Sequence, residues 1–595
     1  MNIPLSERSM FLKGLFWLLP LTGMALMFYW SARNTSDVPK WDAFPLVATP
    51  LIKSLDGTLT YADLHEQMVD NRMLFPRIVH LAAARLTHWS TPAETATTVL
   101  FGGLSVLMLA GLARRTWPQG GWCPWVVAAV AGTLWFSLSG SMIWTYGPFL
   151  CHAMVACLAV AQVWVFSLSI PPLRKIFLGC VLAFVAANSF IYGWLSWGLL
   201  GWQILGLWVN QTIRRREFLV ALGILSGVMA LAGWWYFAGY AFAGKSGIAG
   251  RMMAEPMRYG NFFLQWLGSG LGNPWPNLAK SSHLAWQYSL AWWAGMGLLI
   301  LMAITAVLVW KNRSTRPAAW HWCGLIWWGL VRGIFVTIGR ADFSSEAAFW
   351  PRYQLLVYAL YLGLAVVLWL NISQLRSLWK WLGLLPLGIA VTGWMNGSIT
   401  GYREMRADYF RSQTVHGALI MKEVAPDPVL LNQLFPGNFA AVDRTIKTLL
   451  PRGFIRPGIV QNETVADAKI ERSPRFQGAL SEGENQADGT VSLNGWAVDK
   501  QMASPVDAVV ISVQPDGGEE IWWTVATKSK PANKQALKLK LSAANSRIGW
   551  DLGANETIQD LSRKPLPAGK LTFRAYALDV KTLVFHPLDG EYRRE

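Results

Sequence analysis

Cysteine and charge are both scarce in this 595-residue sequence. The five cysteines lie in or beside apolar segments, and no two have the spacing of metal ligands. A disulfide framework or a cysteine-bound zinc site is therefore not expected, and nothing else in the sequence indicates a cofactor or a metal. Charged residues make up 15% of the chain, against roughly 25% in soluble domains, which argues against an ordinary soluble protein.

Apolar and aromatic residues are abundant instead. Hydrophobic residues make up 53% of the chain, which also contains 35 tryptophans and 27 phenylalanines. Tryptophan favours the headgroup zone of a bilayer, where its ring is buried while its N–H stays hydrated. A chain that crosses a membrane many times would offer many such positions.

The net charge is +17, and the basic residues of the first 400 positions occur mostly in short clusters between apolar runs. Loops on the cytoplasmic side of a membrane have this composition. Nucleic-acid-binding surfaces differ, because they place a basic stripe beside aromatics that stack on bases. We therefore expect membrane lipids, and not nucleic acid, as partners.

About eleven apolar segments approach the ~20 residues that are needed to cross a bilayer. They cover residues 11–30, 94–113, 123–141, 148–169, 176–191, 193–210, 218–239, 287–310, 319–338, 352–371 and 380–397. Each basic cluster follows an even-numbered span: Arg114-Arg115, Arg174-Lys175, Arg214-Arg215-Arg216, Lys311 with Arg313 and Arg316, and Arg376 with Lys380. This alternation predicts a multi-pass protein of a bacterial inner membrane, with a cytoplasmic N-terminus and a periplasmic C-terminal part.

The predicted topology divides the chain into a transmembrane domain, residues 1–398, and a periplasmic tail. The transmembrane domain has a long first periplasmic loop, residues 31–93. In the tail, residues 399–470 look helical, residues 471–488 read as a linker, and residues 489–595 alternate with a period of two between turn residues, which predicts a small all-β sandwich. The cytoplasmic face keeps only short connectors, so any chemistry would occur outside, where nucleotide-activated donors are not supplied.

The first periplasmic loop carries the most informative charges. Asp42 lies just past the first span, beside aromatic residues, and Asp70 is followed closely by Arg72 and Arg77. A carboxylate can accept the proton of a hydroxyl nucleophile, and arginines can stabilise a departing phosphate. The alternative is that these charges only solvate a surface loop.

A second set of charges lies between the ninth and tenth spans. Arg340, Arg352 and Tyr353 would suit a lipid phosphate, through forked guanidinium N–H groups and a phenol. The alternative is an interfacial anchor, because these residue types gather at membrane surfaces. Arg332 lies inside the ninth span, where a charge is costly and indicates function, unless the side chain extends outward to the interface.

With these residues, the chain resembles the GT-C superfamily of polytopic glycosyltransferases over residues 10–400. Members have a long first outer loop with a catalytic acid shortly after the first span, which here maps onto Asp42. Bacterial relatives carry a stretch like HNEHR…FPR, to which the segment from Met68 to Arg77 is similar, and the later Arg352-Tyr353 pair is similar to their RY element. Met68 and Asn71 stand where that pattern has histidines, so a histidine-bound metal is not expected.

The resemblance implies an inverting glycosyltransferase, closest to enzymes that modify O-antigen. It would move a hexose such as glucose from a polyprenyl-phosphate donor to a periplasmic glycan such as lipopolysaccharide. Asp42 would be the general base and Asp70 a second acid or orienting group, with the donor phosphate held by Arg72, Arg77, Arg332, Arg340, Arg352 and Tyr353. A glycan polymerase or ligase with a pyrophosphate-linked donor, a transporter or flippase of lipid-linked sugars, and a non-catalytic anchor remain open alternatives.

Overall fold

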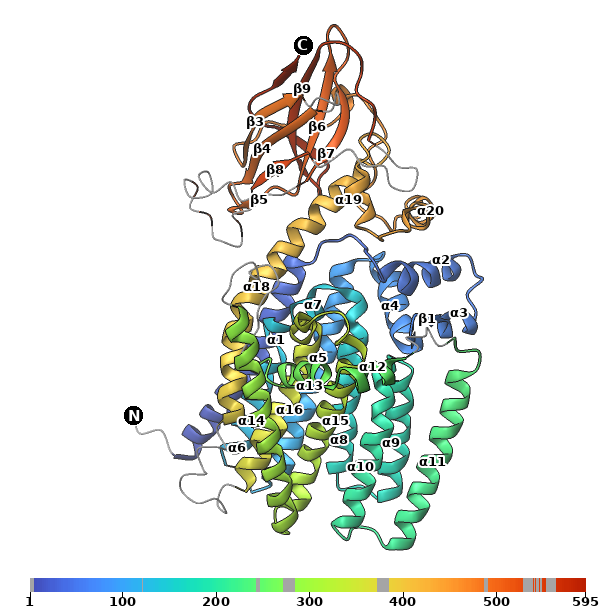
Figure 1. Ribbon diagram of the computed structural model, residues 1–595, viewed down its shortest axis with the longest axis vertical. Helices are drawn as coiled ribbons and strands as arrows, with labels where there is room; N and C mark the ends of the chain where they lie inside the picture. The colour runs from blue at the N-terminus through green and yellow to red at the C-terminus, as the bar shows by residue number, and fades with distance from the viewer. Residues whose placement is uncertain are drawn as a thin grey trace. The chain divides into compact units, whose positions relative to one another are not determined.

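The computed structural model describes residues 5–119, 121–241, 247–270, 284–371, 385–485, 491–527, 548–552 and 563–595, together with residues 539, 541 and 545. The chain forms two compact units (Figure 1). Unit 1 contains residues 1–33, 60–79 and 95–401, and unit 2 contains residues 34–59, 80–94 and 402–595. The predicted first loop is therefore not one piece, because its middle belongs to unit 1 and its two flanks belong to unit 2.

Unit 1 is a bundle of long helices (Figure 1). Several of them begin with proline in the first turn, where the missing N–H has no helical acceptor and the fixed φ suits the helix. The long helices are α1 (Leu5–Asn34), α5 (Thr91–Thr116), α6 (Cys123–Trp135), α8 (Leu150–Ser167), α9 (Pro172–Ala187), α10 (Leu195–Val209), α11 (Arg215–Phe237), α14 (Leu284–Lys311), α15 (Arg316–Arg340), α16 (Pro351–Leu370) and α18 (Leu385–Ile420), the last of which continues into unit 2. Shorter helices are α3 (Tyr61–His65), α4 (Leu74–Thr87), α7 (Ser141–Thr145), α12 (Ile248–Ala254) and α13 (Pro256–Leu267).

Seven helical segments among the described residues are long and apolar enough to cross a membrane. The other four predicted spans coincide with α1, α9, α10 and α18, which are not among the seven, so the predicted number of about eleven is not confirmed. At ~1.5 Å per residue, α9 and α10 are shorter than the ~30 Å hydrocarbon core, since they have 16 and 15 residues. The outer surface is nonetheless apolar, as in Trp234 of α11, which is 73% exposed. These features indicate a membrane-embedded protein.

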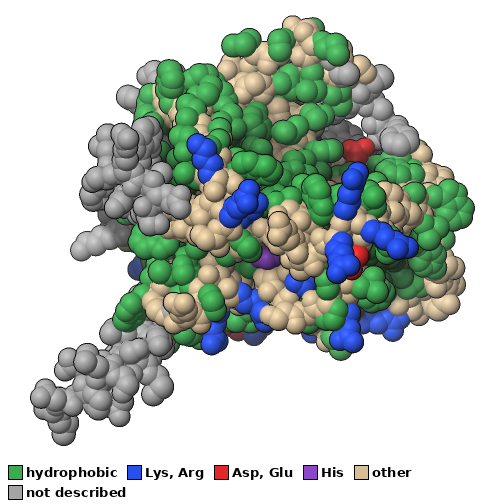
Figure 2. Space-filling view, turned by 90° about the horizontal axis from the view of Figure 1, so that it is seen from below, with side chains coloured by type: hydrophobic (Ala, Val, Ile, Leu, Met, Phe, Trp, Pro, Cys, Tyr) green, Lys and Arg blue, Asp and Glu red, His purple; other side chains and the backbone are tan. Residues whose placement is uncertain are grey.

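The basic clusters of the described residues lie at one end of unit 1. Contacts join the helix ends there: Lys175 Nζ donates to the Phe166 carbonyl at 2.8 Å, and Trp322 Nε1 donates to Thr116 Oγ1 at 2.8 Å. Figure 2 views the molecule from this end and shows several Lys and Arg side chains with few acidic ones. These contacts join the ends of α8 and α9 and of α5 and α15 beside three of the basic clusters. Arg376 and Lys380 lie outside the described residues, and the side of a membrane that the clusters face stays a prediction.

Unit 2 combines short helices with two antiparallel sheets. Its helices are α2 (Thr49–Leu55), α19 (Pro428–Asn432) and α20 (Phe439–Leu449). One sheet has the order β10-β9-β6-β7 with β11 also on β9, and the other has the order β3-β4-β5 with β8 also on β4. The strands are β3 (Phe476–Asn485), β4 (Val491–Asp499), β5 (Ser504–Pro505), β6 (Ala508–Pro515), β7 (Ile521–Ala526), β8 (Gly549–Asp551), β9 (Leu571–Asp579), β10 (Val584–Pro587) and β11 (Tyr592–Arg594).

The two sheets enclose one apolar core, as expected of a sandwich. Leu493 of β4, Val509 of β6 and Phe573 of β9 are buried together in it. Strands β4 to β11 lie within residues 489–595, where the alternating pattern predicted a sandwich. The predicted linker is wrong, because β3 lies within it. Alternate residues Phe476 and Leu480 of β3 are buried, a pattern that the Gly, Ser and Glu around them obscured.

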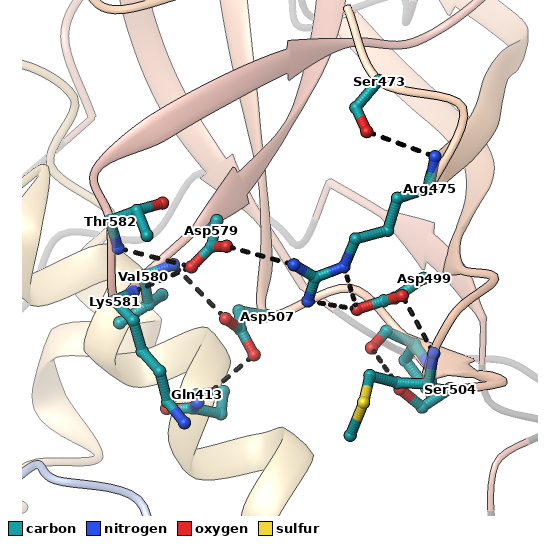
Figure 3. Close-up of polar contacts among 12 residues, drawn as sticks. Gln413, Ser473, Arg475, Asp499, Ser504, Asp507, Asp579, Val580, Lys581 and Thr582 are labelled. Carbon is teal, nitrogen blue, oxygen red and sulfur yellow. Dashed lines mark hydrogen bonds and ion pairs between the residues drawn. The ribbon is translucent and has the colours of Figure 1, made fainter. Parts of the chain in front are cut away.

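Polar contacts join these sheets to α18 (Figure 3). Arg475 pairs with Asp499 at the end of β4 at 2.6 Å and with Asp579 at the end of β9 at 3.7 Å. Asp507 accepts a hydrogen bond from Gln413 of α18 at 3.2 Å. The C-terminal half of α18 is therefore part of the same unit as the sandwich.

Candidate anion-binding site

Arg332 is the most unusual side chain of unit 1, because it is charged and fully buried in α15. It lies eight residues, or about 12 Å, before the end of this helix, and it does not extend to the surface. Its Nη2 donates to Nδ1 of His152 of α8 at 2.9 Å. A guanidinium group stays protonated, so this imidazole nitrogen is the acceptor. Within the described part of the chain, Nε and Nη1 of Arg332 have no hydrogen-bond partner.

Aromatic rings contribute most of the remaining surroundings of Arg332. Its guanidinium carbon lies 5.0 Å from the centre of the Tyr192 ring and 5.5 Å from that of Trp328. Cation–π contacts of this kind stabilise a desolvated guanidinium by ~2 kcal/mol. They do not neutralise its charge, so an anion would gain much by binding here.

Arg340 and Arg352 flank the short connection between α15 and α16. Arg340 Nε donates to the phenol oxygen of Tyr353 at 3.0 Å, and the guanidinium of Arg352 lies 4.2 Å from the centre of the Trp350 ring. Pro351 starts α16, which fixes Arg352 and Tyr353 in its first turn. Both arginines are half-buried, and Tyr353 is buried.

These three arginines, which we call the arginine cluster, converge on one region. Arg340 and Arg352 share the rings of Trp350 and Tyr353. The guanidinium of Arg352 also lies 5.7 Å from the centre of the Phe149 ring, which packs at 5.3 Å against the ring of His152, the partner of Arg332. None of the ion pairs among the described residues includes a member of the cluster. Three like charges in a poorly hydrated site repel one another, and an anionic ligand would relieve this repulsion.

A small hairpin carries the predicted acid Asp70. Strands β1 (Gln67–Met68) and β2 (Asn71–Arg72) are joined by the two-residue turn Val69-Asp70. Asn71 accepts a hydrogen bond from the backbone N–H of Ile191 at 2.9 Å, which ties the hairpin to the turn that carries Tyr192. Asp70 itself is exposed. The link between this predicted acid and the site is therefore the hairpin that carries it, which is bonded to the Tyr192 turn.

Asp342 follows Arg340 by two residues in the sequence, and two of its partners lie on α12 and α13. It pairs with Arg251 of α12 at 3.1 Å and accepts a hydrogen bond from the phenol of Tyr259 of α13 at 2.6 Å. Its charge is therefore shared with α12 and α13.

Arg72 does not fit its predicted role as a phosphate ligand. It is buried, and its Nη1 donates to Nδ1 of His65 at 2.8 Å while its Nη2 donates to the Ala238 carbonyl at 2.7 Å. Burial, followed by the positive charge of Arg72, lowers the pKa of His65 to about 4. The neutral imidazole can therefore accept this hydrogen bond at neutral pH.

Arg77 is also used within the protein. Its Nη1 donates to the carbonyls of Asp63, Leu64 and Glu66 at 3.0, 3.1 and 2.7 Å. The last carbonyls of a helix lack intrahelical donors, and Arg77 supplies one at the end of α3. The predicted phosphate ligands at positions 72 and 77 are therefore not retained in the site.

Asp42 belongs to unit 2, whereas the arginine cluster belongs to unit 1. It is exposed, and its carbonyl accepts the N–H of Leu46 at 3.0 Å as a helical turn begins. Its role as general base stays a prediction.

His152 and Tyr192 are site residues that sequence reasoning did not place. His152 lies inside an apolar span, and it forms an interhelical hydrogen bond with Arg332. Tyr192 stands between two short apolar helices, and no local pattern indicates which helix ends its ring would face. No protein-family model matches the chain, and a search of curated proteins found no match either.

Proposed function

We propose that the chain is an inverting glycosyltransferase that moves a hexose such as glucose from a polyprenyl-phosphate donor to a periplasmic glycan. The observation that carries this proposal is the arginine cluster near one end of an apolar helical bundle. Among the described residues, Nε and Nη1 of Arg332 and Nε of Arg352 have no hydrogen-bond partner. A lipid-linked phosphate combines the two properties that such a place requires. Its anionic group would bind the guanidinium groups, and its hydrocarbon chain would remain among the apolar helices.

The reaction breaks the bond between the anomeric carbon and the phosphate oxygen. An acceptor hydroxyl oxygen forms the new bond to that carbon from the opposite face, which inverts its configuration, and a carboxylate takes the hydroxyl proton. The electron pair of the broken bond leaves with the polyprenyl phosphate, whose negative charge increases. Arg332, Arg340 and Arg352, with the phenol of Tyr353, would stabilise this charge as it develops.

Two carboxylates are available for the proton. Asp42 is the base that the resemblance to the GT-C superfamily implies. Asp70 is the second acid, and the hydrogen bond between its hairpin and the turn that carries Tyr192 supports a role in orienting the acceptor. Comparing Asp42→Asn with Asp70→Asn decides between them, because loss of a general base typically lowers the rate by ~10²–10⁴.

The side of the membrane on which the site would lie follows from the distribution of basic residues in unit 1. The basic end of unit 1 would face the cytoplasm of a bacterium by the positive-inside rule. The arginine cluster lies at the opposite end of α15, a helix of 25 residues and about 37 Å. The site would then open to the periplasm across the inner membrane, where lipid-linked donors replace nucleotide sugars.

One observation also favours a pyrophosphate-linked donor, as a glycan polymerase or ligase would use. Three guanidinium groups exceed what one phosphate monoanion needs for neutralisation, and a diphosphate could engage all three.

The test uses membranes that contain the full chain, radiolabelled polyprenyl-phosphate-glucose and a lipopolysaccharide acceptor. Arg352→Gln should lower transfer by ~10²–10³, the usual effect of removing one group that stabilises developing charge. Arg452→Gln is the control, since it removes an exposed arginine that pairs with Asp56 in unit 2. Normal transfer by a correctly inserted Arg340→Gln/Arg352→Gln protein would refute the proposal. Activity with the pyrophosphate donor alone would favour the polymerase or ligase.

A further inference from the structure

A basic cavity lies at the end of unit 1 opposite the arginine cluster. Its volume is about 520 Å³. It is formed where α5 ends, α6 begins and α8 ends, and its lining residues come from these helix ends and their connections: Arg114, Arg115, Trp117, Pro118, Pro124, Trp125, Ser167 and Ser169. Because α5 and α8 are among the membrane-crossing candidates, this position corresponds to a membrane surface.

The cavity is positively charged. The guanidinium of Arg114 lies 5.7 Å from the centre of the Trp125 ring. Arg115 Nη1 makes two long contacts, at 3.4 Å to the Ser167 carbonyl and at 3.5 Å to Ser169 Oγ. The charge of Arg115 also acts on the buried ammonium of Lys175. No ion pair within the described residues joins these three cations to a carboxylate. An anion could therefore bind without displacing an internal partner.

An apolar groove adjoins this cavity, and Trp117 lines both. The groove has a volume of about 230 Å³ and follows α6 from Trp122 to Val130, about 12 Å of helix at ~1.5 Å per residue. Residues of α16 and Leu387 of α18 form its other wall, and Val126 on the α6 side is 40% exposed. Its walls are hydrocarbon and aromatic side chains, so it suits an acyl chain.

We infer that the cavity and the groove together bind one anionic phospholipid. The phosphate would lie between Arg114 and Arg115, and one acyl chain would lie along α6 in the groove. Basic pockets between the ends of membrane helices are suited to anionic headgroups. A free phosphate would leave the groove unused, and a zwitterionic lipid would gain less from the charge. This inference does not depend on the proposed function, since the two sites lie at opposite ends of unit 1.

The experiment measures lipid binding to the full, delipidated chain in detergent by native mass spectrometry. Phosphatidylglycerol should bind the wild type at least tenfold more tightly than phosphatidylcholine. Arg114→Gln/Arg115→Gln should weaken phosphatidylglycerol binding roughly 10- to 30-fold, at the ~1 kcal/mol that each basic residue contributes near an anionic membrane surface. Arg114→Lys/Arg115→Lys should keep binding within a few-fold of wild type.

Two comparisons separate this site from general surface charge. Arg215→Gln/Arg216→Gln removes the same charge from exposed positions at the start of α11 and should leave phosphatidylglycerol binding unchanged. Val126→Trp fills the groove without changing the charge, so it should weaken binding of a long-chain phosphatidylglycerol but not of a dihexanoyl analogue.

Three results would overturn the inference. They are wild-type binding by Arg114→Gln/Arg115→Gln, equal loss in the α11 control, and full competition by millimolar inorganic phosphate with no dependence on chain length. If the glutamine variant does not yield monodisperse protein, Val126→Trp and the lysine variant still decide the question.

Discussion

Replacing Arg332 with methionine distinguishes a functional role of this arginine from a structural one. A functional arginine predicts a large loss of donor binding with little loss of stability, and a structural arginine predicts the reverse. Methionine keeps a flexible side chain of similar length but removes the charge. A charged residue at a helix centre in a membrane costs ~2.5–3.5 kcal/mol. Against this, the hydrogen bond to His152 contributes ~1.5–3 kcal/mol, as bonds to charged groups do, and the ring contacts contribute ~0.5–2 kcal/mol.

These terms nearly cancel, so Arg332→Met should change the free energy of unfolding by less than about 2 kcal/mol. Part of any loss would come from Nδ1 of His152, which would be left buried without a donor. His152→Leu in the same background should restore that part. Binding of polyprenyl phosphate should behave differently, because a group aimed at a developing or bound anionic charge is worth ~2.7–4 kcal/mol.

The assay pairs a thermal unfolding series in detergent with a titration of polyprenyl phosphate on the same samples. We expect a small shift in unfolding and at least a hundredfold loss of binding or transfer. If Arg332→Met were strongly destabilised while the surviving folded protein bound phosphate normally, Arg332 would be a structural residue and the argument for the arginine cluster would fail.

Three further predictions concern stability. Asp427→Asn should destabilise unit 2 by ~3–5 kcal/mol, because it removes the charge of a buried carboxylate that lies 2.7 Å from Nη2 of Arg563. Unchanged protease resistance would contradict this prediction. Burial lowers the pKa of His416 to about 4 from an unfolded value of 6.5. The stability that the neutral imidazole contributes is therefore present above pH 6.5 and is lost as the pH falls to 4, by up to ~3 kcal/mol. His416→Gln should flatten the acid unfolding profile of unit 2 over that range, and an unaltered profile would refute the assignment. Gly193→Ala should both lower the melting temperature and weaken donor binding. An added Cβ would lie 1.7 Å from the Ala186 carbonyl oxygen, next to the turn that carries Tyr192. A folded variant with normal binding would show that this turn does not position the site.

The bundle and its basic end could be predicted because they depend on local composition. An apolar run of sufficient length and a cluster of arginines at its end are visible in the sequence alone. The number of crossings was harder, because α9 and α10 are short and their packing, not their length, decides where they lie.

The site could be predicted in part. Arg332 and Arg340 lie on one span, and Arg352 and Tyr353 begin the next. Their proximity could be predicted because a single short connection joins the two spans. His152 and Tyr192 come from other helices, and no local pattern specifies which helices are neighbours.

Arg72 and Arg77 show contacts inside the protein that the sequence does not reveal. Their position in an outer loop beside an acid suggested phosphate binding, but carbonyl groups at the end of α3 and at Ala238 accept hydrogen bonds from these two guanidinium groups. Such contacts become visible only when the backbone path is known.

The division of the first outer loop between the two units has a practical consequence for dissecting the protein. The chain passes from one unit to the other between residues 33 and 34, 59 and 60, 79 and 80, 94 and 95, and 401 and 402. No single cut can therefore release unit 2 whole. Truncation at residue 401 would remove Asp408, which lies 2.8 Å from the ammonium of Lys40. A tail expressed alone would lack the two loop segments that belong to its unit. Loss of activity after truncation at residue 401 would therefore not show a catalytic role for the sandwich, because residues 34–59 and 80–94 would have lost the rest of their unit.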